Sequence, residues 1–130
     1  MASESLHEPR EDLSEGVIDK HRAVASLMEE LEAIDWYDQR AAATRDEELK
    51  AILIHNRNEE MEHAAMVLEW LRRRHPEMDE HLRTYLFCEG DILAAEERAS
   101  AADGGDEGAG AADGSLGIGS LRESAQDASA

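Results

Sequence analysis

The chain has 130 residues, with 31 Asp and Glu against 13 Lys and Arg, and a formal net charge of −18. So acidic a chain has no basic stripe to neutralise phosphates, which excludes nucleic acid and anionic membrane surfaces as partners. No apolar run approaches the roughly 20 residues of a membrane span, and residues 1–15 are too polar for a secretory signal. The single Cys88 cannot form an intrachain disulfide. We therefore expect a reducing cytoplasm and a free thiol with no dedicated role.

The first predicted helix follows a polar N-terminal arm at residues 1–13. Ser14 is a suitable N-cap, and no proline occurs from there to about Ala43. Apolar residues recur at helical spacing through this stretch, namely Val17, Val24, Leu27, Leu31 and Ile34. Residues 44–46 are the best break, and Asp46 can cap the helix that follows.

A second helix is predicted from about Glu47 to Arg74. Three consecutive arginines in its last turn suit the negative end of the helix dipole. Pro76 stops this helix and is acceptable at the start of a short third helix, which we expect to run to about Phe87. The packing residues of the third helix would be Leu82, Tyr85, Leu86 and Phe87.

The two long helices should form an antiparallel hairpin, because the predicted connection between them is very short. Each helix would be roughly 40 Å long at about 1.5 Å per residue. Two helices cannot bury both sides of their apolar stripes, and chains of this size usually need a metal, a disulfide or a partner chain. We therefore expect an all-α protein that associates with copies of itself; a solitary coiled-coil hairpin is the alternative.

Polar residues interrupt the apolar seam of each long helix. In the second helix, Asn56, Glu60 and His63 lie in a row that is otherwise apolar, with Leu49, Leu53, Val67 and Trp70. In the first helix, Glu30 lies in a row with Ala23, Leu27, Ile34 and Tyr37. Burying an unpaired carboxylate costs several kcal/mol, so a cation is the natural compensation.

The hairpin geometry predicts that these polar residues meet. If the turn is centred near Arg45, Glu30 and Glu60 lie at the same height, each roughly 22 Å from the turn at the standard helical rise. His63 is one turn further along and on the same face as Glu60, because residues three apart are neighbours on a helix. Glu30, Glu60 and His63 should therefore converge.

This set is half of a ferritin-like di-iron or di-manganese site, which takes two lone carboxylates and two Glu-x-x-His pairs from four helices. The chain supplies each part once, so two chains are needed, and their four carboxylates balance two divalent ions. Glu-x-x-His alone is usually a solvated helix face, and the spacing does not choose among iron, manganese and zinc. Pairings such as Glu59 with Glu62 are possible, but those residues point away from the seam.

Four blocks of the sequence closely resemble the encapsulated ferritins, which are two-helix members of the ferritin-like group. The blocks are residues 28–40 (MEELEAIDWYDQR), 55–66 (HNRNEEMEHAAM), 68–73 (LEWLRR) and 81–87 (HLRTYLF). The resemblance covers roughly residues 6–89. It implies an all-α chain that forms a ferritin-like four-helix arrangement only on dimerisation, with residues 14–98 as its helical domain.

The resemblance also implies a function. Members of the family are ferroxidases that oxidise Fe(II) at a di-iron centre shared between two subunits, and their dimers assemble into a ring-shaped decamer. The family's metal ligands fall on Glu30, Glu60 and His63, with Glu60 bridging the two irons. Trp36 and Tyr37 match an aromatic pair beside the centre, and Glu29 and Glu32 match carboxylates that receive iron at an outer position.

The roles of those four flanking residues have simpler alternatives. Tyr37 lies on the Glu30 row and can hydrogen-bond a ligand, as outer partners of metal ligands usually do. A redox role for Tyr37 or Trp36 is a hypothesis beside simple packing of Trp36. For Glu29 and Glu32, the alternative to transient binding of hydrated cations is an inert acidic surface.

The C-terminal part of the chain has a different composition. Residues 99–114 and 123–130 are rich in Gly, Ala, Asp and Ser, so we expect a disordered linker and tail. Between them, residues 115–122, which begin at Ser115 and end at Arg122, carry three aliphatic side chains: Leu116, Ile118 and Leu121. This segment resembles the cargo-loading peptides of encapsulin shells, although such peptides often end the chain. The resemblance implies docking to the shell protein and residence inside an encapsulin nanocompartment.

Two other classes of function remain open on the sequence alone. A metal-dependent peroxidase or electron carrier of the rubrerythrin type usually needs a four-cysteine iron site, which a single cysteine cannot build, or a partner that carries one. A non-enzymatic helical module could use the polar seam residues only to set pairing register. The predicted reaction with Fe(II) distinguishes the ferroxidase from this module.

Overall fold

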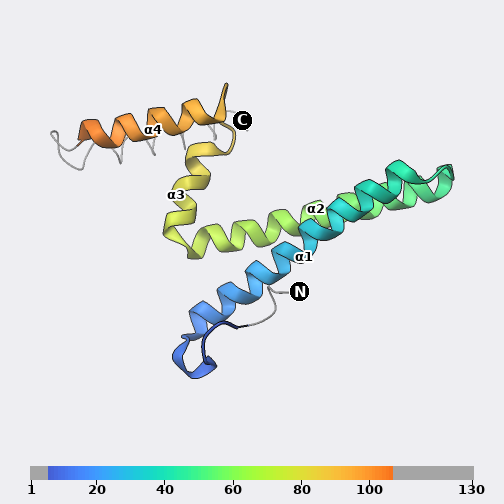
Figure 1. Cartoon of the computed structure of the whole chain (residues 1–130), viewed down its shortest axis with the longest axis horizontal. Helices are drawn as coiled ribbons and strands as arrows, with labels where there is room; N and C mark the ends of the chain where they lie inside the picture. The colour runs from blue at the N-terminus through green and yellow to red at the C-terminus, as the bar shows by residue number, and fades with distance from the viewer. Residues whose placement is uncertain (1–5, 107–130) are drawn as a thin grey trace, which may run out of the picture. The chain divides into compact units, whose positions relative to one another are not determined.

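The structure, a computed structural model, describes residues 6–106, and all regular elements in this part are helical (Figure 1). The elements are the 3₁₀-helix η2 (Arg10–Asp12) and the α-helices α1 (Glu15–Ala43), α2 (Glu47–Arg74), α3 (Pro76–Tyr85) and α4 (Ile92–Asp106). The predicted all-α class is confirmed. The chain divides between His75 and Pro76 into two compact units, the first containing α1 and α2 and the second α3 and α4.

The long helices begin where their caps predict. The Ser14 hydroxyl accepts a hydrogen bond from the Val17 backbone N–H at 3.2 Å, satisfying one of the free donors of the first turn of α1. The Asp46 carboxylate does the same for the Leu49 N–H at 2.8 Å in α2. Between the helices, the extended Thr44 stops α1 and accepts a hydrogen bond from the Asp46 N–H. Three residues therefore suffice to reverse the chain.

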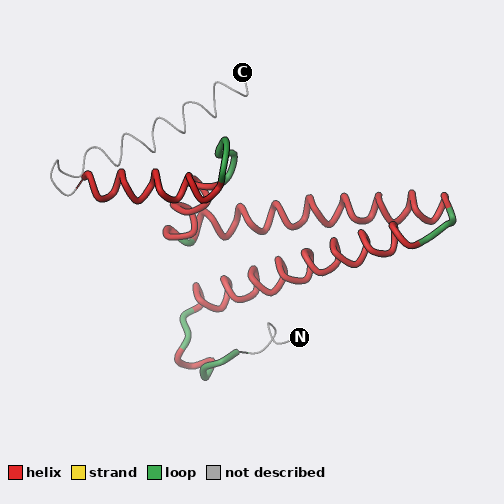
Figure 2. The backbone as a smooth tube through the Cα atoms, turned by 45° about the horizontal axis from the view of Figure 1, so that its top comes forward, coloured by secondary structure: helices red, strands yellow, loops and turns green. Residues whose placement is uncertain are grey.

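Helices α1 and α2 pack side by side as an antiparallel hairpin with the 44–46 loop at one end (Figures 1 and 2). The buried residues of these helices are Ile18, Ala41, Ala64 and Leu71. More of their apolar side chains stay exposed, among them Val17, Val24, Met28, Leu31, Ile52, Met61 and Met66. The hairpin buries only part of its apolar surface, as the sequence predicts for two helices.

The second unit departs from the sequence prediction in two ways. Helix α3 ends at Tyr85 rather than Phe87, because Phe87 adopts the left-handed conformation (φ 60°), which ends a helix. Helix α4, which was not predicted, begins after a left-handed Gly90 (φ 77°) and is capped by Asp91, whose carboxylate accepts from the Ala94 N–H at 3.2 Å.

Helix α4 also corrects the predicted linker. It runs to Asp106, so residues 99–106 are helical rather than disordered. Alanine is the strongest helix former, and Ala99, Ala101 and Ala102 carry the helix forward to the Gly104–Gly105 pair. The rest of the predicted linker, the docking segment 115–122 and the tail lie outside the described residues. Within residues 6–106, no helix is both long enough and apolar enough to cross a membrane.

Candidate metal centre

Glu30 of α1 meets Glu60 and His63 of α2 across the hairpin seam. The Nδ1 atom of His63 lies 3.4 Å from Glu60 Oε2 and 3.7 Å from Glu30 Oε2. One ligand-type atom from each of the three side chains lies within 4.8 Å of the others. The predicted convergence is therefore confirmed as geometry. In the described part of the chain, no other group of three or more His, Cys, Asp or Glu side chains meets the same condition.

Secondary structure explains the convergence. Glu60 and His63 are one helical turn apart on α2, so both point to the same side. Glu30 lies at the matching height on α1 because the loop between the helices is only three residues long. Both carboxylates are about three-quarters buried, with exposed side-chain fractions of 24% for Glu30 and 25% for Glu60, whereas His63 is 44% exposed. The cluster thus lies in the seam but opens to the outside through His63.

The two carboxyl groups perturb each other. A hydrogen bond with the Glu60 carboxyl raises the pKa of Glu30, and burial and the negative charge of Glu60 raise it further. The same hydrogen bond lowers the pKa of Glu60, with a smaller contribution from His63, while burial opposes this shift. The two pKa values are therefore shifted in opposite directions, so that Glu30 stays protonated to a higher pH than usual while Glu60 ionises at a lower one. Each carboxylate disfavours ionisation of the other, and a bound cation would stabilise both in the charged form.

The donor set fits a divalent transition-metal ion. Carboxylate oxygens and an imidazole nitrogen suit iron, manganese or zinc, whereas calcium and magnesium prefer oxygen alone. Nδ1 of His63 is the ring nitrogen that faces both carboxylates, so it is the atom that would donate to the metal. One chain offers three ligands and leaves one side of the cluster open, which is too few for a closed dinuclear site.

The aromatic pair predicted beside the centre packs with an arginine of its own helix. Trp36 is exposed and Tyr37 is half-buried, and the guanidinium carbon of Arg40 lies 5.7 Å from the centre of each ring. These are cation–π distances. Neither aromatic side chain is part of the ligand group.

The other acidic residues considered from the sequence lie outside the cluster. Glu29 is exposed, yet close enough that its charge adds to the raised pKa of Glu30. Glu32 is half-buried, and Glu62 is exposed. Glu59 lies 3.7 Å from His55 on the outer side of α2. Of the acidic and histidine residues considered from the sequence, the structure thus brings together Glu30, Glu60 and His63.

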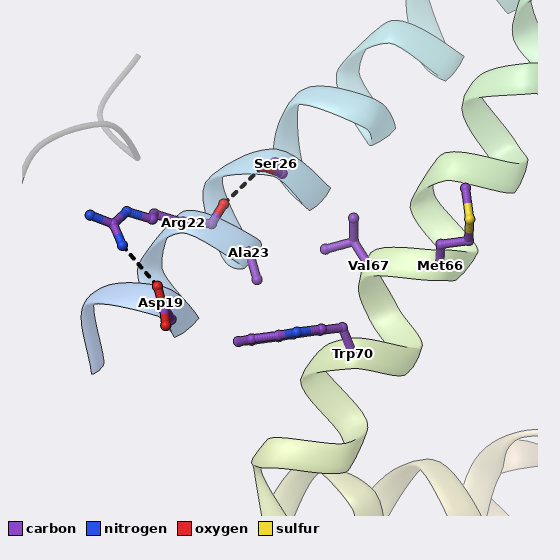
Figure 3. A pocket seen from close by; sticks show the side chains of 7 residues that line it. All are labelled: Asp19, Arg22, Ala23, Ser26, Met66, Val67 and Trp70. Atoms are coloured by element: carbon purple, nitrogen blue, oxygen red, sulfur yellow. Dashed lines mark hydrogen bonds and ion pairs between the residues drawn. The ribbon is translucent and has the colours of Figure 1, made fainter. Parts of the chain in front are cut away.

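Further along the seam, toward the open end of the hairpin, α1 and α2 flank an open hollow of about 400 Å³ (Figure 3). Ala23 projects from α1 toward Val67 and the ring of Trp70 on α2, with polar residues such as Arg22 and Ser26 at the side. These three apolar residues belong to the rows that contain Glu30, Glu60 and His63. The seam is therefore not filled by side chains of a single chain.

One inter-helix contact near the cluster was not predicted from the sequence. The Arg57 guanidinium of α2 donates a hydrogen bond through Nη1 to the Asp38 carboxylate of α1 at 3.0 Å. Opposite charges separated by 19 residues give no local sequence signal, in contrast to pairs three or four apart on one helix. The register of the hairpin could have indicated it, since both residues lie between the cluster and the loop.

The fold and the donor set define an all-helical hairpin with a carboxylate–imidazole cluster that can hold a metal ion. Residues 5–89 match the EncFtn-like family, and the chain belongs to that family. This confirms the resemblance to the encapsulated ferritins, and the protein is ferritin-like.

Two similar proteins match most of the chain, and a solved structure matches a smaller part of it. The chain is 59% identical over 127 residues to an encapsulated ferritin-like protein of Rhodospirillum rubrum, covering 94% of this chain and 91% of the relative. It is 52% identical over 116 residues to a ferritin-like protein of Thermotoga maritima, covering 89% and 96%. A crystal structure of a protein from Nitrosomonas europaea is 56% identical with a TM-score of 0.66, covering 68% of this chain and 97% of that one.

Proposed function

We propose that this protein is a ferroxidase that oxidises Fe(II) to Fe(III) at a di-iron centre completed by a second copy of the chain. The observation that carries the proposal is the convergence of Glu30, Glu60 and His63 within 4.8 Å in the hairpin seam. Membership of the EncFtn-like family supports iron as the metal. The similarity to a protein described as encapsulated and ferritin-like points the same way.

The stoichiometry follows from what one chain provides. Each copy contributes Glu30, Glu60 and His63, so a pair contributes four carboxylates and two imidazoles, and two divalent ions balance the charge of the carboxylates. By the family resemblance, Glu60 would be the ligand shared by both ions, and Glu30 and His63 would each hold one. The hollow of Figure 3 leaves the seam incompletely filled, and α1 has further apolar side chains exposed elsewhere on its surface; both support a second chain as partner.

The protein's own part in the reaction is to gather, orient and deprotonate the ligands. Bound iron supplies the redox chemistry: two Fe(II) ions lose two electrons, which with two protons reduce one dioxygen to hydrogen peroxide. Glu30 must release its proton before it can bind a cation, and the negative charge of Glu60 beside it then attracts the ion. His63 presents Nδ1 to the same point, which requires the neutral imidazole with its proton on Nε2.

Four flanking residues have proposed supporting roles. Tyr37 would hydrogen-bond a ligand, and Trp36 would pack beside the centre. Glu29 and Glu32 would hold hydrated cations briefly on the surface next to Glu30, where a negative field raises the local concentration of Fe(II).

The proposed destination of the oxidised iron is an encapsulin shell. Residues 115–122 would dock this chain to the shell protein, and the linker before them would let the helical domain work inside the compartment. An open ring of subunits, a decamer by analogy with the family, cannot enclose a mineral. The shell in the cytoplasm would therefore be the iron store, and this protein its oxidising component.

Ligand substitutions test the proposed centre. Glu30→Ala, Glu60→Ala and His63→Ala should each lower the initial rate of aerobic Fe(II) oxidation more than about 100-fold, exceeding the 10- to 100-fold expected for outer partners of ligands. Fe(III) absorbance gives the rate, and circular dichroism checks that helix content is intact. Glu59→Ala is the matched control, because Glu59 precedes Glu60 but faces outward toward His55. Unchanged rates in all three ligand variants would contradict the assignment.

The docking segment is tested separately from the chemistry. Replacing Leu116, Ile118 and Leu121 together with Ser should abolish co-purification with a co-expressed encapsulin shell protein. The oxidation rate of the free protein should not change, because the replaced side chains lie far along the chain from the centre. A triple variant that still enters the shell would refute the role of residues 115–122 in docking.

A further inference from the structure

An ion pair across the hairpin lies close to the cluster of Glu30, Glu60 and His63, on the side of the 44–46 loop. Arg57 of α2 donates from Nη1 to the Asp38 carboxylate of α1 at 3.0 Å. Its Nε and Nη2 atoms donate to the Asn58 side-chain oxygen at 3.3 and 3.1 Å. Two hydrogen bonds therefore hold the guanidinium on α2, and its Nη1 atom bonds to α1. In the described part of the chain, most side-chain hydrogen bonds join residues no more than four apart in sequence, whereas Arg57 and Asp38 are 19 residues apart.

Helical geometry places this bond on one flank of the seam. Along the axes, Asp38 lies about 12 Å from Glu30 and Arg57 about 4.5 Å from Glu60, both toward the loop. At about 100° per residue, Asp38 is rotated roughly 80° from Glu30 and Arg57 roughly 60° from Glu60. On antiparallel helices these two rotations turn toward the same side. The difference in height is about 7.5 Å at the standard rise, close to the length of an arginine side chain.

A bond in this position constrains how α1 can rotate and slide against α2. The seam beside the cluster offers little other directional hold, since apolar packing is non-directional and the buried residues Ala41 and Ala64 are small. Rotation of α1 by a single residue position, about 100°, would carry Asp38 off the flank. The same movement would turn Glu30 away from Glu60 and His63.

The cluster cannot supply this constraint for itself before metal arrives. The two carboxylates and the imidazole meet in the seam, and like charges that face each other do not hold a pair of helices together. A positive side chain that joins the two helices outside the cluster keeps them in register. Arg57 has the length, the charge and the partner for this role.

We propose that Arg57 and Asp38 are positioning residues, which hold α1 and α2 in the register that presents Glu30, Glu60 and His63 to one metal ion. They do not touch the metal; they preorganise its ligands. This inference rests on the proposed function only in taking those three residues as the ligands, so it is tested by metal binding rather than by oxidation.

The test is a titration of the full-length protein with Co²⁺ at neutral pH without oxygen, followed by the visible absorption of the bound ion. Arg57→Gln and Asp38→Asn should each weaken Co²⁺ binding by roughly two- to fivefold, the size expected for an exposed ion pair. Arg57→Asp should weaken it further, because two carboxylates then face each other. The exchanged pair Asp38→Arg with Arg57→Asp should recover most of the loss. Helix content and thermal midpoint show whether each variant is folded.

Arg73→Gln is the matched control, since the exposed Arg73 bonds Glu69 at 2.7 Å within α2 and does not line the hollow of Figure 3. Its Co²⁺ affinity should equal that of the unmodified protein. Equal affinity in the Arg57 and Asp38 single variants would overturn the proposal, and so would an exchanged pair that recovers nothing. If the unmodified protein binds Co²⁺ but fails to oxidise Fe(II), only the proposed function falls. If it does not bind Co²⁺ at all, both fall.

Discussion

At the scale of single residues, the opposite pKa shifts of Glu30 and Glu60 predict a measurable dependence of stability on pH. Both carboxyls have an ordinary pKa of 4.5 when unperturbed, and folding moves them apart, raising the pKa of Glu30 and lowering that of Glu60. A raised carboxyl pKa contributes to stability below 4.5, and the contribution is lost as pH rises through the folded value. A lowered one contributes above 4.5 and is lost as pH falls through its folded value.

These signs predict how the metal-free protein responds to pH. As pH rises above 4.5 and Glu30 ionises, the unmodified protein should lose stability relative to Glu30→Gln, which keeps a hydrogen bond to Glu60 and cannot ionise. Thermal midpoints across this range, at fixed protein concentration, measure the difference. With Co²⁺ present the order should reverse, because the amide cannot neutralise a metal ion. Parallel pH profiles of the two metal-free proteins would show that the carboxyls do not share a proton.

The same residues show what the sequence could and could not reveal about the site. Glu30, Glu60 and His63 were identifiable because each breaks an apolar row, and two such rows must face each other in a hairpin. Asp38 and Arg57 interrupt no apolar row: the register of the hairpin brings them near each other, but whether they bond depends on the path of a long flexible side chain. Which ring nitrogen of His63 faces the carboxylates likewise depends on a side-chain rotamer.

At the scale of helices, the two caps that flank the loop fix where the chain turns and therefore which residues are level with each other. Asp46→Ala removes the acceptor for the Leu49 N–H and should destabilise the protein by about 1 kcal/mol. Thermal or denaturant unfolding at a fixed protein concentration measures this. Asp46→Asn is the control, because asparagine caps a helix about as well. Equal losses in both variants would mean that charge rather than the cap is responsible.

Helix boundaries were predictable where local chemistry sets them. Ser14, Asp46 and Pro76 mark helix starts by caps or by proline geometry, and the structure agrees at all three. Helix α4 was missed because its residues after Asp91 combine a weak apolar pattern with many alanines, so periodicity gave no signal while propensity favoured a helix. The composition from residue 99 onward indicated a disordered linker, but the helix propensity of its alanines extends α4 as far as Asp106.

At the scale of the whole molecule, α1 carries an apolar stripe that its own chain leaves uncovered. Val17, Val24, Met28 and Leu31 are 47%, 40%, 48% and 53% exposed, and they recur at intervals of seven, four and three residues. That spacing is typical of a helix–helix seam. The sequence predicts a partner for this stripe, but the arrangement of the partner depends on two surfaces at once and cannot be obtained from one chain.

A charge placed in the stripe should therefore disrupt self-association. Leu31→Lys would force an ammonium group into the contact and should shift the protein toward monomers, as seen by light scattering or analytical ultracentrifugation. Ala43→Lys, at the exposed last residue of α1 and rotated about 120° from Leu31 around the helix, should leave the size unchanged. If Leu31→Lys keeps the size of the unmodified protein, the stripe is not the contact surface.

Metal should be coupled to the same association, because the proposed centre draws its ligands from two chains. Any ion that binds the pair and not the separated chains stabilises the pair in proportion to the logarithm of its concentration over its dissociation constant. Stripping metal with a chelator should move the protein toward smaller species, and adding Fe²⁺ without oxygen, or Co²⁺, should restore the larger ones. Glu60→Ala, which removes the proposed bridging ligand, should make the size insensitive to metal. A size distribution that is the same with and without metal in the unmodified protein would contradict a shared centre, because binding within one chain gives no such linkage.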